Sequence, residues 1–271
     1  MGFRSRIKLE LRKGFRSAQA GWERFQAPFL AKRDLERIAS INALSRLKEL
    51  VLPEGIEQGN AKLVLFSHYH PKGWLQACIR REIADLRARG WQVLLLTDAL
   101  DRDGLEWCKA KGLGLMLRRN EGRDFGAFQD GLLALQQRGL MAAIDRLILL
   151  NDSVYPITDL GGSSWPLFLE GAGDLVLGFS DSFQNGYHLQ SYGLHLPGDV
   201  LQQHWWWSFW SRYRGWGGMT MAIRDGEIGL SQLLLSHGVG LRALHPVSHL
   251  RAQISSRELL EKLQVHCSIE A

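Results

Sequence analysis

The sequence has few cysteines and no long hydrophobic run. Its three cysteines, among 271 residues, are an odd number and show no CxxC or Cys/His spacing. This argues against a disulfide framework and against structural zinc, and it suits a reducing compartment. No stretch approaches the ~20 apolar residues that a membrane-spanning helix needs. The first 16 residues carry six basic residues and no apolar core, so we expect no secretory signal.

Three common motifs are also missing. No GxGxxG follows the first expected strand, and neither GxxxxGK[ST] nor GxSxG occurs. A dinucleotide-binding Rossmann domain, a P-loop nucleotidase and an α/β-hydrolase are therefore not expected. His68 and His70 follow a strand, but Pro71 ends it and no third ligand has a recognisable spacing. The sequence does not favour zinc there.

The positive charge is concentrated at one end. Residues 1–33 hold nine Lys/Arg and two acids, or +7, while the whole chain is +5, so the other 238 residues are −2. This pattern disfavours nucleic-acid binding, which would require a basic face on the folded domain. The segment also carries aromatic and aliphatic residues at helical spacing. We expect it to lie on an anionic membrane surface; the alternative is that it packs on the protein's own body.

The rest of the chain predicts an α/β fold. Residues 34–50 show helical apolar spacing, and a Pro/Gly linker follows. Strands are then expected at 63–67, 91–97, 113–117 and 146–150, alternating with helices at 74–89, 103–111 and 125–138. This order predicts a mostly parallel, Rossmann-like sheet flanked by helices.

The second half of the chain is less regular. Its expected strands are 174–179, 187–196 and 239–244, and its expected helices are 200–214, which is rich in tryptophan, and 227–237. The predicted organisation is a basic helical extension with its linker, residues 1–60, and a domain at 61–271. That domain has a first half, 61–160, and a second half, 161–271.

Polar residues gather where the expected parallel strands end, and ligands bind at that edge of such sheets. A glycine-bearing loop with arginines then opens a helix, which allows close approach to a pyrophosphate. A carboxylate after the next strand, Asp152, could hold Mg²⁺ or Mn²⁺. The alternative is a helix cap by Asp124 and a simple turn at Asn151. The candidate donor-binding residues are Ser67, His68, Tyr69, Asp98, Asn120, Arg123, Asp124, Asn151, Asp152 and Ser153.

Five motifs in this order resemble the rhamnan synthesis protein F family of bacterial polysaccharide glycosyltransferases. They are Phe-Ser-His-Tyr (66–69), Asn-Glu-Gly-Arg-Asp-Phe-Gly-Ala-Phe (120–128), Leu-Asn-Asp-Ser-Val (150–154), Gly-Phe-Ser-Asp-Ser (178–182) and His-Leu-Gln-Ser-Tyr (188–192). The resemblance covers roughly residues 61–245. More distantly, the layout is similar to nucleotide-sugar transferases of the GT-A fold. Their metal-binding acidic motif corresponds here to Asn151-Asp152-Ser153, which has one carboxylate.

The resemblance implies a transferase that uses an activated sugar such as dTDP-rhamnose to build a cell-surface glycan on a glycan or polyprenyl-linked acceptor. Inverting transfer needs a general base, and in GT-A enzymes a carboxylate before a helix supplies it. Glu227 is the first candidate and Asp225 the second; the alternative is an ordinary acidic first turn of a helix. The candidate acceptor-binding residues are Asp181, His188, Gln190, Tyr192 and Trp210.

The expected protein is therefore a GT-A-like enzyme that uses a divalent cation. It would be cytoplasmic and peripheral on the inner face of the cell membrane. The second hypothesis is a non-catalytic glycan-assembly or scaffold protein with the same fold. The single carboxylate of Asn151-Asp152-Ser153 keeps that hypothesis open.

Overall fold

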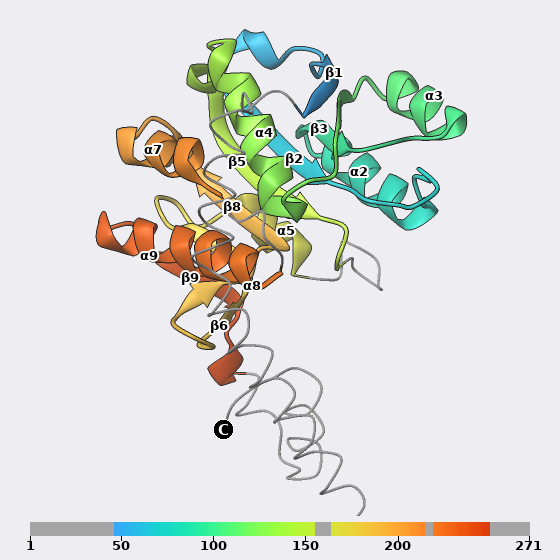
Figure 1. Ribbon diagram of the computed structural model, residues 1–271. Coiled ribbons are helices and arrows are strands. Elements are labelled where there is room, and N and C mark those ends of the chain that lie inside the picture. The colour runs from blue at the N-terminus through green and yellow to red at the C-terminus, as the bar shows by residue number, and fades with distance from the viewer. Residues whose placement is uncertain (1–45, 155–163, 215–218, 250–271) are drawn as a thin grey trace, which may run out of the picture. The chain divides into compact units, whose positions relative to one another are not determined.

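The computed structural model describes residues 46–154, 164–214 and 219–249 (Figure 1). The chain divides into two units, residues 1–43 and 44–271, and every described residue belongs to the second. The basic segment 1–33 and most of the helix predicted at 34–50 lie outside the described residues. Cys78 and Cys108 are free thiols, and no helix within the described ranges has the length and apolar character needed to cross a bilayer.

A nine-stranded mixed sheet forms the centre of the second unit. Its order is β1-β4-β3-β2-β5-β8-β6-β7, and β9 pairs with β6. The strands are β1 (Leu47–Val51), β2 (Ala61–Ser67), β3 (Gln92–Thr97), β4 (Gly114–Arg118), β5 (Ile144–Asn151), β6 (Val176–Ser182), β7 (His188–Leu189), β8 (Gly193–Pro197) and β9 (Leu241–His245).

Helices cover both faces of this sheet. They are α2 (Ala77–Ala88), α3 (Arg102–Ala110), α4 (Arg123–Gln137), α5 (Trp165–Glu170), α6 (Gly198–Leu201), α7 (His204–Arg212), α8 (Met219–Met221) and α9 (Gly229–Ser236). Two 3₁₀ turns, η1 (Ile56–Gln58) and η2 (Met141–Ala143), and a π-helical segment, η4 (Ala222–Ile228), complete the described elements.

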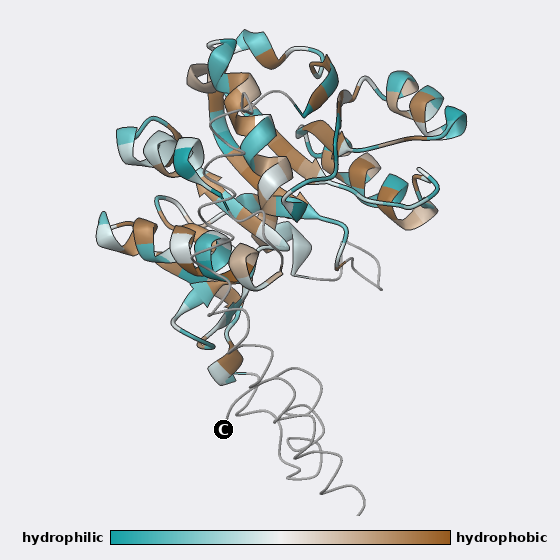
Figure 2. Cartoon of the chain, viewed as in Figure 1, coloured by the Kyte–Doolittle hydropathy of each residue, from teal (hydrophilic) through white to brown (hydrophobic). Residues whose placement is uncertain are grey.

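The central strands are apolar throughout because both of their faces are buried. In β2, Leu63 and Leu65 join the core under α4, whereas Val64 and Phe66 face the core under α2. Figure 2 shows these strands as a continuous hydrophobic band between the helices. Such runs are typical of parallel strands covered on both sides. Gly131 of α4 permits close packing, since an added Cβ would lie 3.2 Å from the Leu65 side chain.

The predicted α/β class is confirmed, but the sheet is parallel only in part. β2, β3, β4 and β5 form parallel pairs, and β6 pairs parallel with β9. The pairs β1–β4, β5–β8, β6–β8 and β6–β7 are antiparallel. The short connection between β6, which ends at Ser182, and β7, which begins at His188, explains one of these pairs, because a parallel crossover needs a dozen or more residues.

The helix predicted over 34–50 is wrong at its C-terminal end. Leu47–Val51 forms β1, an edge strand antiparallel to β4. The apolar spacing there fits a helix, but the open hydrogen-bonding edge of β4 decides the outcome. The sheet therefore begins before residue 60.

Three predicted elements of the second half differ from those in the structure. The strand expected at 187–196 is two strands, β7 and β8, and the helix expected at 200–214 is α6 followed by α7. The helix expected at 227–237 starts earlier, because η4 precedes α9 without a break. The other predicted elements are confirmed with ends shifted by up to three residues, and α5 was not predicted.

Candidate functional site

The first polar cluster lies at the point in the sheet where the strand order reverses. β2 stands between β3 and β5, so the chain leaves it toward one edge of the sheet and later returns on its other side. Ser67 and Asn151 are register partners at the C-terminal ends of β2 and β5. In open α/β sheets, ligands bind in the crevice beyond the strand ends at such a switch point.

Asp124, in the first turn of α4, joins the two strand ends. Ser67 Oγ donates to its Oδ1 at 2.8 Å, and Asn151 Nδ2 donates to its Oδ2 at 2.8 Å. Burial raises the pKa of Asp124, the hydrogen bond from Ser67 lowers it, and the charge of Asp152 raises it further. Both carboxylate oxygens are thus used in holding the strand ends and the helix together.

The backbone before Asp124 has an uncommon conformation. Gly122 has φ 77° and Arg123 has φ 54°, and positive φ is strained for a residue with a side chain. Gly126 is required by close packing, since an added Cβ would lie 2.4 Å from the carbonyl oxygen of Glu121. Arg123 is exposed at the N-terminus of α4, where the helix dipole also favours an anion.

Asp152 lies beside this group with one oxygen engaged. Its Oδ2 accepts a hydrogen bond from the Tyr69 backbone N–H at 2.9 Å, and its own N–H donates to the Ser67 carbonyl at 3.2 Å. The described residues contain no set of three or more His, Cys, Asp or Glu side chains able to hold a metal. Asp152 alone therefore fits a divalent cation only if phosphate oxygens of a ligand complete the coordination.

Glu82 of α2 is buried near Asp152. Its side chain is 2% exposed, and no described residue forms a hydrogen bond with its Oε2. Burial raises the pKa of Glu82 to about 8, and the charge of Asp152 contributes in the same direction. Glu82 is therefore mostly neutral at pH 7. Sequence patterns do not single out Glu82, because it lies within an ordinary amphipathic helix.

The other predicted donor residues are placed less uniformly. His68 is buried, with Nδ1 3.3 Å from Thr97 Oγ1, and burial lowers its pKa, so it lies beneath the site as a support. Asp98 follows β3 and has one buried oxygen without a partner. Asn120 and Ser153 are exposed, and Ser153 donates its N–H to Asn151 Oδ1 at 3.0 Å.

A second cluster surrounds Glu227. Its Oε1 accepts hydrogen bonds from the N–H of Ser191 at 3.1 Å and from the Ser191 hydroxyl. Its Oε2 lies 3.8 Å from His188 Nε2, while His188 Nδ1 contacts the Gly186 carbonyl at 2.8 Å. The Glu227 side chain is 13% exposed. One oxygen is thus fixed by Ser191, and the other is available to a hydroxyl group.

Glu227 belongs to the π-helical segment η4, not to the start of a helix as predicted. Gly226 allows η4 to pack closely on α4, because an added Cβ would lie 2.8 Å from the Phe125 ring. π-helical turns are rare and often occur at functional sites. Asp225, the second candidate base, instead makes a bidentate pair with Arg224 at 2.6 and 2.8 Å.

The two clusters are neighbours. The Asn151 N–H of the first cluster donates to the Tyr192 carbonyl at 3.5 Å, and Ser191 of the second cluster immediately precedes Tyr192. The Tyr192 hydroxyl pairs with Ser180 Oγ, and burial raises its pKa. The Gln190 N–H donates to the Ser180 carbonyl at 3.0 Å. The motif at 188–192 thus links β5, β6 and η4.

Two predicted acceptor residues have structural roles here. Trp210 is fully buried and stacks on Phe125 with ring centroids 5.9 Å apart, so it is a core residue and cannot stack on a sugar. Asp181 accepts a hydrogen bond from the Val247 N–H at 2.7 Å. This bond ties β6 to the segment after β9.

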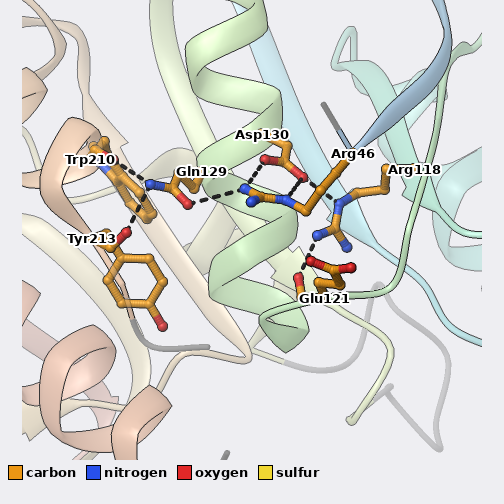
Figure 3. A network of polar contacts seen from close by, with 7 residues as sticks. All are labelled: Arg46, Arg118, Glu121, Gln129, Asp130, Trp210 and Tyr213. Carbon is orange, nitrogen blue, oxygen red and sulfur yellow. Dashed lines mark hydrogen bonds and ion pairs between the residues drawn. The ribbon is translucent and has the colours of Figure 1, made fainter. Parts of the chain in front are cut away.

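A buried ion-pair network along α4 contacts the loop that precedes the first cluster (Figure 3). Asp130 of α4 pairs with Arg46 and with Arg118, whose Nε lies 2.7 Å from Asp130 Oδ2. Arg118 also donates to the Glu121 carbonyl, and Gln129 Nε2 donates to the Trp210 carbonyl at 2.6 Å. The network fixes the loop before Asp124 and connects α4 to α7.

Comparison with known proteins gives a distant relative. No family model matches the chain. The uncharacterized protein y4gN of Sinorhizobium fredii (strain NBRC 101917 / NGR234) is 26% identical over 202 residues, which cover 72% of this chain and 51% of y4gN. The chain thus spans about half the length of the curated relative it matches. Neither comparison bears on the resemblance to the rhamnan synthesis protein F family.

Proposed function

We propose that this chain is a glycosyltransferase that moves a sugar from a nucleoside-diphosphate donor to a glycan or polyprenyl-linked acceptor. The observation that supports this most is the position of the Ser67–Asp124–Asn151 group with Asp152 at the switch point of the sheet. The exposed Arg123 at the N-terminus of α4 adds a cation for the diphosphate. The motif resemblance favours a GT-A-like enzyme and a donor such as dTDP-rhamnose.

The proposed reaction is a single displacement. An acceptor hydroxyl attacks the anomeric carbon of the donor, and its proton passes to Glu227 Oε2 as the new C–O bond forms. The bond between the anomeric carbon and the diphosphate oxygen breaks, and its electron pair leaves with the nucleoside diphosphate. Ser191 holds the Glu227 carboxylate in position, and His188 stands next to it. When bound, a divalent cation held by Asp152 and the diphosphate would neutralise charge on the leaving group.

A screen of nucleotide-sugars for hydrolysis tests this proposal. The purified chain is incubated with dTDP-, UDP- and GDP-sugars, and release of the nucleoside diphosphate is measured with and without Mn²⁺. We expect one donor to be hydrolysed slowly without an acceptor, and we expect Glu227→Gln to stop this hydrolysis. Release at the background rate from every donor would contradict the proposal.

The second candidate is a non-catalytic glycan-assembly protein of the same fold. The absence of a multi-ligand metal cluster from the described residues favours it. Calorimetric titration with dTDP and UDP separates the two. Nucleotide binding without turnover of any donor would support the scaffold reading.

For residues 1–33 we propose contact with an anionic membrane surface. The segment carries +7 and the remainder −2, and each cation near such a surface contributes about 1 kcal/mol. Removing residues 1–33 should abolish co-sedimentation with phosphatidylserine vesicles and move the pI to the acidic side. Unchanged sedimentation of the truncated chain would show that the segment is not the anchor.

A further inference from the structure

A groove of about 920 Å³ runs between α7 and the continuous helix formed by η4 and α9. Its α7 wall includes Trp205 and Phe209, which lie one turn apart on the same face of α7, and Tyr213, which directly follows the helix. At 1.5 Å per residue, this wall is about 12 Å long, enough for two sugar rings. Of the predicted site residues, the groove includes only Asp225.

One end of this groove is positively charged. Arg212, Arg214 and Arg224 all line it, and Arg224 is paired with Asp225. Within the described residues, the side chains of Arg212 and Arg214 make no hydrogen bond or ion pair. Three arginines and one aspartate give this end a charge of +2. Guanidinium groups bind carboxylate and phosphate through paired hydrogen bonds.

The rest of the wall is aromatic. Trp205 is partly exposed and stacks on His237 with ring centroids 4.5 Å apart, and Phe209 is also partly exposed. Apolar walls with a few fixed polar groups are typical of small-molecule sites. Flat rings beside a charged end suit a saccharide that carries an anionic group, whereas a bare anion would use only the arginines.

The charged end of the groove meets the second cluster through Tyr213. This side chain is 5% exposed, and its hydroxyl has no hydrogen-bond partner among the described residues, which is costly for a buried polar group. Burial raises the pKa of Tyr213, and so do the nearby charges of Asp225, Glu227 and Asp124. The Tyr213 ring lies 5.5 Å, between centroids, from the ring of Phe125, the residue after Asp124, and Phe125 also packs against Gly226, the residue before Glu227.

We propose that this groove binds the acceptor, and that the acceptor is a saccharide bearing a carboxylate or phosphate group. Arg212 and Arg214 pair with the anion, and the aromatic wall contacts the sugar rings. This inference rests on the proposed sugar transfer, because that reaction gives the groove its role.

The test compares charged and neutral sugars. Binding of glucuronic acid, glucose 1-phosphate and glucose is measured by ligand-observed NMR, with inorganic phosphate as a further probe. We expect both charged sugars to bind at least tenfold more tightly than glucose. Equal affinity for all three sugars would overturn the proposal, and so would inorganic phosphate binding as tightly as glucose 1-phosphate. The stronger of the two charged sugars identifies the anion as carboxylate or phosphate.

Variants locate the site. Arg212→Gln with Arg214→Gln should remove the preference for charged sugars, whereas the control Arg102→Gln should not, because Arg102 is 91% exposed on α3 and is not among the residues that line the groove. Trp205→Leu removes a partly exposed ring that lines the groove, so we expect at least threefold weaker binding of the charged sugar, with circular dichroism as the check on the fold. Parental binding in both groove variants would overturn the proposal.

Titration with dTDP and UDP on the same samples distinguishes the two hypotheses. If a nucleotide binds but charged sugars are not preferred, the groove proposal fails and sugar transfer stands. If charged sugars bind in the groove but no nucleotide binds, the transferase proposal fails, and so does the role of this groove as an acceptor site.

Discussion

The two carboxylate clusters differ in how far the protein satisfies their oxygens. Asp124 accepts a hydrogen bond at each oxygen, from Ser67 and from Asn151. Glu227 accepts two hydrogen bonds from Ser191, both at Oε1. Its other oxygen, Oε2, lies 3.8 Å from His188 Nε2. A fully bonded buried carboxylate holds structure together, whereas one with an open oxygen can accept a proton from a ligand. This difference is why we propose a structural role for Asp124 and the role of base for Glu227.

Among the variants below, Glu227→Gln should have the largest effect, and that effect should be on the rate of sugar transfer. Gln keeps the volume and can still accept from Ser191, but it cannot take a proton. We expect the transfer rate to fall by roughly 10²- to 10⁴-fold with donor affinity unchanged, measured by steady-state kinetics and calorimetry. Asp225→Asn is the matched control, because it removes the same charge from the same segment. A larger loss in Asp225→Asn would move the base to that residue.

Asp130→Asn tests the framework behind the first cluster. It breaks a buried pair with Arg46 and Arg118 and leaves guanidinium charge without its carboxylate, which costs about 3–5 kcal/mol. Urea unfolding measures this loss. Glu106→Gln is the control, because its pair with Arg102 is exposed and should change stability by less than about 1 kcal/mol. Similar losses in the two variants would mean that the network does not support the fold.

Asp152→Ala should weaken metal-dependent nucleotide binding at least tenfold and leave the fold intact, because Asp152 is only partly buried and accepts one backbone hydrogen bond. Calorimetry with Mn²⁺ measures the binding, and circular dichroism checks the fold. Undiminished Mn²⁺-dependent binding would exclude Asp152 as a metal ligand.

Glu82→Gln should change the pH dependence of stability. With a folded-state pKa of about 8 against 4.5, the native chain keeps a proton that the unfolded chain releases in this window. Stability therefore falls as pH rises from about 4.5 to 8, by up to about 1.4 kcal/mol per pH unit from this group. The variant should lack this contribution and gain stability at pH 8.

The raised pKa of Asp124 also makes stability fall as pH rises, and it does so in the parent and in Glu82→Gln alike. The difference in stability between the parent and the variant therefore isolates the contribution of Glu82. Urea unfolding at pH 5, 6, 7 and 8 measures it. Parallel stability curves for parent and variant would show that Glu82 ionises normally.

The two halves of the domain also differ in how well the sequence predicts them. The order from β2 to β5 follows from apolar runs alternating with amphipathic helices, because each strand is buried on both faces. The polar ends of these strands identified Ser67, Asn151 and Asp152. In the second half, the short β7 and β8 and the π-helical η4 depend on tertiary pairing, so local patterns merged or misplaced them.

The same limit applies to the site. Glu227 was predicted from its place in the chain, but its partner Ser191 is 36 residues away and only the fold brings the two together. Tyr213 and Glu82 gave no signal, since their importance comes from burial and from neighbouring charges. Trp210 was misassigned because a tryptophan-rich helix suggests sugar stacking as readily as core packing.

The most direct test of the account is a crossed titration of dTDP and UDP, with Mn²⁺, into the parent chain, Asp152→Ala and Glu227→Gln. The account predicts that the parent and Glu227→Gln bind a nucleoside diphosphate with equal affinity, and that Asp152→Ala binds it at least tenfold more weakly. Equal affinity in all three proteins, or no binding to the parent, would contradict a donor site at the ends of β2 and β5.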